Sequence, residues 1–167
     1  MLCCRQISNL RCRQMRIKGE HGEVLLLPNF LHWVESSIES NLYRVLYMGD
    51  QNEPEPLHNG DLACMWFTSA CTRMWGLSSE PHTWVEHGVA HHLNCGWRLT
   101  HHARPGCLIV WGPRPGGTHK HIGILLSAKE AVSNSSAVRQ PQRHSANLPR
   151  RTRLALLEHP LLHSEKA

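Results

Sequence analysis

The sequence predicts an α+β domain in which helices come first and an antiparallel sheet follows. Residues 28–47 repeat apolar side chains at three- and four-residue spacing, as the buried face of a helix does. Short apolar runs at 107–112 and 121–127 are separated only by a Pro- and Gly-rich loop, which is typical of antiparallel strands. This order of elements favours a helix packed on one face of a sheet.

Two more helices are expected between the first helix and the sheet. Asp61 is a suitable N-cap, and no Gly or Pro interrupts the chain until Gly76, which stands where a C′ glycine belongs. These signals predict a helix over residues 62–75. A shorter helix near 83–93 and an extended piece at 96–99 complete the segment before the strands.

A third strand is expected at residues 131–134, after a Lys-Glu turn. From about residue 139 the chain is rich in Arg, Pro and Gln, and residues 154–163 favour a short helix that Pro160 interrupts. The sequence therefore predicts a basic N-terminal extension, one domain and a basic, partly disordered C-terminal tail, at residues 1–27, 28–137 and 138–167.

The composition restricts the partners of the chain. Its apolar runs are far shorter than the ~20 residues that cross a bilayer, so we expect no transmembrane segment. The basic first residues lack an apolar stretch of the signal-peptide kind. The net charge of +5 comes largely from the two ends and favours contact with an anionic polymer such as a cell-wall polyanion. No recognition motif accompanies the arginines, which argues against a nucleic-acid partner.

The seven cysteines are odd in number and scattered, and none forms a C-x-x-C pair. A disulfide framework would leave one thiol over, and the usual knuckle of a structural zinc site is missing. We therefore expect reduced thiols, which favours synthesis in the cytosol.

A cysteine and a histidine stand where a nucleophile and its base belong. Cys64 is the third residue after Asp61, so the unsatisfied N–H groups of a helix start would stabilise its thiolate. His121 begins a predicted strand and shares one face with Gly123 and Leu125. Because Gly123 allows a close approach, we expect the cysteine-bearing helix to lie over His121, whose neutral ring would take the thiol proton.

The third strand offers a residue to orient the imidazole. Asn134 is the favoured candidate because an amide holds a ring more firmly than a rotating hydroxyl does, and Ser133 is the alternative. If Val132 belongs to the core, Asn134 shares its covered face.

Four segments in this order resemble the NlpC/P60 and CHAP families of cell-wall hydrolases. They lie within residues 60–137 and read ACMWFTSA, RPGCLIVWG, HKHIGILLS and AVSNSS. The resemblance implies a papain-like core, in which the helix that bears the cysteine packs on a small antiparallel sheet.

The resemblance also implies an activity and its residues. Cys64 matches the nucleophile, His121 the base, and Ser133 or Asn134 the third position. The activity would be endolysin-like hydrolysis of amide bonds in peptidoglycan stem peptides or cross-bridges, at the cell wall or in a phage particle, without a cofactor.

Two departures leave an alternative open. Cys107 stands where the families have an aspartate, and Lys120 stands where they have a glycine. A positive charge at Lys120 would disfavour protonation of the neighbouring His121. The alternative is a catalytically inactive structural or binding protein, of a phage tail or the cell wall, that retains the fold.

A metal-binding protein is the remaining alternative, because histidines are abundant. His87 is spaced three and four residues from His91 and His92, which places all three near one helix face. Adjacent histidines point in different directions, however, and no matching cysteine pair accompanies them. We therefore expect no resident metal.

Overall fold

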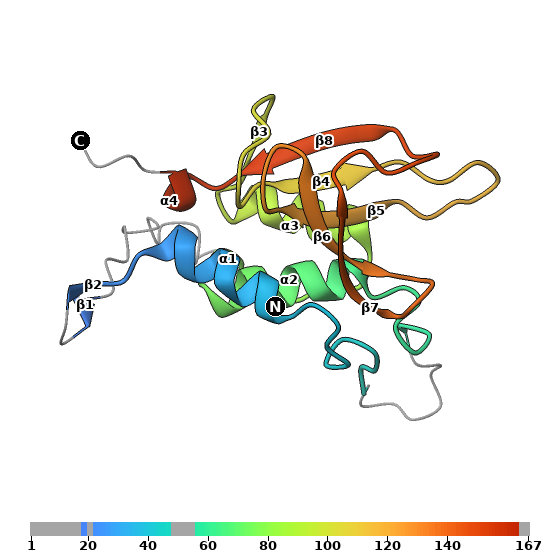
Figure 1. Ribbon diagram of the computed structural model, residues 1–167, viewed down its shortest axis with the longest axis horizontal. Helices are drawn as coiled ribbons and strands as arrows, with labels where there is room; N and C mark the ends of the chain where they lie inside the picture. The colour runs from blue at the N-terminus through green and yellow to red at the C-terminus, as the bar shows by residue number, and fades with distance from the viewer. Residues whose placement is uncertain (1–17, 20–21, 48–55, 164–167) are drawn as a thin grey trace, which may run out of the picture.

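The computed structural model describes residues 18–19, 22–47 and 56–163 (Figure 1). Its elements, in chain order, are β1 (Lys18–Gly19), β2 (Gly22–Glu23), α1 (Leu26–Ser36), α2 (Cys64–Met74), α3 (Val85–Asn94), β3 (Arg98–Thr100), β4 (Leu108–Trp111), β5 (His121–Leu125), β6 (Glu130–Ser135), β7 (Gln140–Ser145), β8 (Arg153–Glu158) and α4 (Pro160–His163). The α+β class is confirmed, as are the third helix and the strands β3 to β6 at their expected places.

Six of the strands form one antiparallel sheet in the order β3-β8-β4-β5-β6-β7. Helices α1 and α2 lie below this sheet in Figure 1. One apolar cluster fills the space between α2 and the sheet and includes Phe67, Ile122 and Val132. The opposite face carries a second cluster around Trp111 and Leu125. Both faces of the central strands are therefore covered.

Helix α2 begins later than expected, at Cys64. The chain makes a tight turn first, with Leu62 N–H donating to the Leu57 carbonyl at 3.0 Å, and Ala63 takes the N-cap position without a side-chain cap. Asp61 is therefore not the N-cap. The predicted end is confirmed, since Gly76 has a φ of +66° and follows the last turn.

Helix α1 is shorter than the predicted 28–47. It spans Leu26–Ser36, and Glu39 then adopts a φ of +64°. The Glu39 N–H donates to the carbonyl of Pro141 in β7 at 2.9 Å. A hydrogen bond to the sheet thus replaces the next turn of the helix.

The prediction of a partly disordered tail from residue 138 is wrong for the residues up to 163. Strands β7 and β8 belong to the sheet, and β8 pairs with β3 on one side and β4 on the other. The expected helix at 154–163 is instead strand β8 followed by α4, which Pro160 opens. Proline is compatible with a first helical turn, where its missing N–H has no partner to lose.

No helix among the residues described is long and apolar enough to cross a lipid bilayer.

Candidate active site

Cys64 and His121 line the same pocket, of about 240 Å³. The first residue of α2 supplies Cys64, and the first residue of β5 supplies His121. The turn before α2, the start of α3 and the β4–β5 connection form most of the remaining wall. The structure therefore brings the predicted nucleophile and base to one cavity.

Cys64 is the first residue of α2, its thiol lies near backbone N–H groups, and the residue as a whole is only 9% exposed. Burial raises the pKa of this thiol, while the N–H groups of Ile122 and Met65 and the charge of Arg151 act in the opposite direction. Because burial is the largest effect, the resting group is a thiol. A base is needed to make it a nucleophile.

The His121 ring lies against the indole of Trp111, its partner in the register of β4 and β5, with 5.5 Å between ring centroids. Burial lowers the pKa of His121 to about 3, and the positive charge of Arg151 adds to the effect. Lys120, expected to act in this way, instead pairs with Glu86 at 3.1 Å. The His121 ring is thus neutral at neutral pH.

A chain of hydrogen bonds determines which nitrogen of His121 is basic. His144 Nδ1 is 2.8 Å from the Ser145 carbonyl, which only accepts, so the proton of this ring is on Nδ1. His144 Nε2 then accepts from the Ser133 hydroxyl at 2.7 Å. With its proton used, Ser133 Oγ accepts from His121 Nε2 at 2.8 Å. His121 Nδ1 therefore keeps a free lone pair.

Comparison with protein-family models and with curated proteins finds no significant match to this chain. The resemblance to NlpC/P60 and CHAP hydrolases therefore stays a prediction that depends on its four motifs.

Asn134, the favoured third residue, does not contact His121. Its amide Nδ2 donates to the Gly60 carbonyl at 2.6 Å, on the α2 side of the sheet. Val132 is in the core on that side, as expected, but the His121 ring lies on the opposite face with Trp111. Ser133, the alternative candidate, is the residue that the structure brings to His121.

Helix α2 does not lie over the face of β5 that carries His121 and Gly123, contrary to expectation. A Cβ at Gly123 would be 2.9 Å from Ser133 Cβ and 3.3 Å from the Trp111 ring, so the glycine allows β6 and this indole to approach β5. The α2 helix covers the alternate residues of β5, including Ile122. The structure places no hydrogen bond between the Cys64 thiol and His121 among the residues that it describes.

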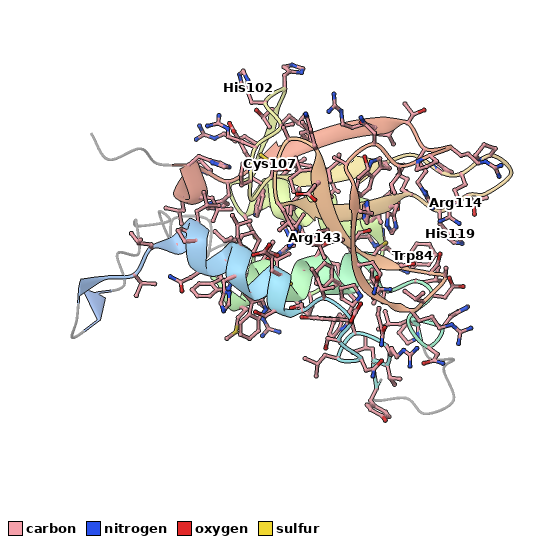
Figure 2. The ribbon with its side chains drawn as sticks, in the orientation of Figure 1. Trp84, His102, Cys107, Arg114, His119 and Arg143 are labelled. Atoms are coloured by element: carbon pink, nitrogen blue, oxygen red, sulfur yellow. The ribbon has the colours of Figure 1, made fainter. Side chains whose placement is uncertain are left out.

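Sequence analysis missed several residues of the site, all of which depend on tertiary structure. His144 and Arg151 lie beyond the predicted end of the domain. Arg151 lines the pocket and donates from Nη1 to the carbonyls of Gly112 and His119 at 2.7 and 3.1 Å. Trp84 faces the ring of His119, 6.3 Å between centroids, where the two lie side by side (Figure 2). No local pattern marks these residues.

The histidine spacing considered for a metal does not form a site. His92 is fully buried and its ring contacts Thr72 Oγ1 at 2.9 Å and the Gly88 carbonyl at 2.6 Å. Two other groups have ligand atoms within 4.8 Å of one another, namely Glu80 with His82 and His91, and Cys107 with Glu158 and His163.

Proposed function

We propose that the protein is a cysteine hydrolase with a papain-like catalytic core that cleaves amide bonds of peptidoglycan, as an endopeptidase or amidase. One observation carries the proposal. The hydrogen-bond chain through Ser133 and His144 leaves His121 Nδ1 without a proton, and His121 and Cys64 line the same pocket. Peptidoglycan as the substrate is what the resemblance of the four motifs to the NlpC/P60 and CHAP families implies.

The reaction uses these groups in two steps. His121 Nδ1 takes the thiol proton as Cys64 Sγ bonds to the substrate carbonyl carbon, and the helix N–H groups beside Cys64 stabilise the oxygen anion. The imidazolium then protonates the leaving amine as the C–N bond breaks, which leaves a thioester. Water, deprotonated by the same nitrogen, hydrolyses the thioester and restores the thiol.

Ser133 and His144 act as positioning residues in this scheme. Ser133 Oγ accepts from His121 Nε2 when the ring is neutral and also when it is an imidazolium, since Nε2 carries a proton in both states. The hydrogen-bond chain therefore stays the same during turnover. Because these hydrogen bonds do not change, the His121 ring keeps one orientation while Nδ1 gains and loses its proton.

A second candidate is a catalytically inactive structural or binding protein of the cell wall or a phage particle. It is favoured by the raised pKa of the Cys64 thiol and by the lack of a hydrogen bond from that thiol to His121 within the described chain. For the hydrolase to be active, substrate binding would have to bring the Cys64 thiol within hydrogen-bond distance of the His121 ring.

Loss of turbidity of purified peptidoglycan distinguishes the candidates. The wild-type protein should clear the suspension, iodoacetamide should block it, and Cys64→Ala should lower the rate by about three orders of magnitude or more. Cys71→Ala is the matched control, because Cys71 is buried two turns further along α2 and does not line the pocket. No clearing by folded wild-type protein would favour the inactive alternative.

Histidine variants test the base. His121→Ala should abolish clearing, whereas His119→Ala should mainly raise KM, because the His119 ring faces Trp84 in the pocket wall and the hydrogen-bond chain runs through His121, Ser133 and His144. Equal loss of kcat in both variants would contradict the assignment of His121.

A further inference from the structure

A group of potential metal ligands lies at the end of α3, away from the residues of the hydrogen-bond chain. Ligand atoms of Glu80, His82 and His91 are all within 4.8 Å of one another. The rings of His82 and His91 are 4.6 Å apart between centroids. The thiol of Cys95 is a further donor, with its Sγ 3.3 Å from His91 Nε2. We propose that Glu80, His82, His91 and Cys95 bind a zinc ion.

Two segments of the chain supply these side chains. His91 and Cys95 are four residues apart at the C-terminal end of α3, so they share one face of the helix. The His82 N–H donates to the hydroxyl of Ser69 at 2.9 Å, and Ser69 is fully buried in α2. The segment that carries Glu80 and His82 is therefore attached to α2, whereas His91 and Cys95 belong to the end of α3.

Ser79 Oγ is 3.1 Å from His91 Nε2 and 3.8 Å from Cys95 Sγ, so a metal ion would have to displace this hydroxyl, whereas His82 and Glu80 lack strong partners among the described residues. His82 Nε2 is buried and has no hydrogen-bond partner in the structure described, which is costly unless something else satisfies it. Glu80 makes no ion pair within the described ranges.

The donor set favours zinc over other divalent cations. Two imidazole nitrogens, one carboxylate oxygen and one thiolate are four ligands of the kinds that zinc takes in tetrahedral sites. Magnesium and calcium prefer oxygen ligands alone. A full set of four protein ligands is typical of structural rather than catalytic zinc.

The second group, Cys107 with Glu158 and His163, is less suitable and provides a control. Glu158 Oε2 is already 3.1 Å from Arg104 Nη2, so a guanidinium competes for the carboxylate. The distance between Cys107 Sγ and His163 Nε2 is 3.8 Å, longer than the 3.3 Å between Cys95 Sγ and His91 Nε2.

A metal at the first group would affect the pocket through the chain itself. His82 directly precedes Thr83, Trp84, Val85 and Glu86, which line the pocket. A metal ion that joins His82 to the C-terminal end of α3 would restrain residues 83–86 of the pocket wall, because they lie between His82 and that helix. The role inferred is structural, and it does not depend on the proposed hydrolase activity.

The test is metal binding by the full-length protein after dialysis against a chelator. Zinc is titrated by calorimetry, and cobalt is used as a spectroscopic probe, because a thiolate ligand produces an intense near-ultraviolet band. Zinc should raise the melting temperature, as any ligand of the folded state does. His82→Ala and His91→Ala should each lower the affinity for one equivalent of zinc by about 100-fold or more, so that this equivalent no longer binds tightly in the titration. Cys95→Ser should remove the cobalt band of that equivalent.

Three results would overturn the proposal: zinc that neither binds the wild-type protein nor raises its melting temperature, binding unchanged in His82→Ala and His91→Ala, or a cobalt band unchanged in Cys95→Ser. The control variants are His163→Ala and Cys64→Ala, both of which should bind as the wild type does. Loss of the same equivalent in either control would place the metal elsewhere. Circular dichroism of each variant confirms that it is folded.

Discussion

Neighbouring residues of β6 have different partners, so their variants should fail in different ways. Ser133 contacts His121 and His144, whereas Asn134 donates to the Gly60 carbonyl. Ser133→Ala should lower kcat by about 10–100-fold with little change in KM, because the ring of His121 loses its orienting partner. Steady-state kinetics on a soluble peptidoglycan fragment measure the two constants.

Asn134→Ala should instead destabilise the fold. The substitution removes the donor to a buried carbonyl and should lower the free energy of unfolding by about 1–3 kcal/mol. Urea titration gives this value, and kcat of the folded fraction should fall less than in Ser133→Ala. A large drop in kcat for Asn134→Ala, with Ser133→Ala unaffected, would restore Asn134 as the orienting residue.

At the scale of elements, β5 depends on the missing side chain of Gly123. A Cβ there would be 2.7 Å from the Val132 carbonyl oxygen and 2.9 Å from Ser133 Cβ. Gly123→Ala should therefore push β5 and β6 apart, reduce stability by about 1–3 kcal/mol and displace Ser133 from His121. Gly117→Ala is the control, since a Cβ there meets only the Arg114 backbone, at 3.4 Å and beyond. Equal thermal midpoints of the two variants would contradict this account.

Elements defined by local signals were predictable, and those defined by tertiary pairing were not. Gly76 ends α2 as expected because a left-handed residue is needed there whatever surrounds it. Asp61 failed as a cap because the turn closed by Leu57 and Leu62 displaced the helix start. Strand β7 was missed because its sequence, QPQRHS, is polar, and as an edge strand it buries little.

The candidate site divides in the same way. Cys64, His121 and Ser133 stand in motifs that local sequence shows, whereas His144 and Arg151 come from segments interpreted as a solvated tail. The periodicity of a helix or strand shows which of its faces is apolar, but it does not show which other element packs on that face. With both faces of β5 buried, periodicity alone was unable to place α2 relative to His121.

At the scale of the whole molecule, buried histidines make stability depend on pH. Burial lowers the pKa of His121 to about 3 and that of His92 to about 4. Burial also lowers the pKa of His82, His144, His159 and His163. Because these pKa values are lower in the folded protein than in the unfolded chain, unfolding below pH ~6.5 increases the number of protons that the rings bind. Stability should be full above that pH and should fall as the pH decreases toward 4.

Urea midpoints across this range, measured with a chelator present, test the dependence. His92→Gln should be less stable than the wild type at neutral pH, yet lose less stability on acidification, because one proton-binding site of the unfolded chain is gone. If the urea midpoint of His92→Gln fell with decreasing pH as steeply as that of the wild type, the acid sensitivity would come from other groups.

The extent of the domain follows from the sheet. A chain ending at residue 137 lacks β7 and β8, and without β8 both β3 and β4 lose a strand partner. Such a chain should fail to unfold cooperatively, whereas one ending at residue 163 should unfold in a single transition. Thermal denaturation followed by circular dichroism distinguishes the two. Cooperative unfolding of the shorter chain would restore the boundary at 137.

The position of β8 also sets an order of events during synthesis. The ribosome makes this strand after every other strand of the sheet, yet β8 pairs between β3 and β4. The sheet is therefore incomplete until residue 158 has left the ribosome. Until then the apolar edge of β4, Leu108–Trp111, is open to pairing with other chains. Contacts of such long sequence separation form slowly. Nascent chains should therefore depend on chaperones, and slower translation should not help them fold.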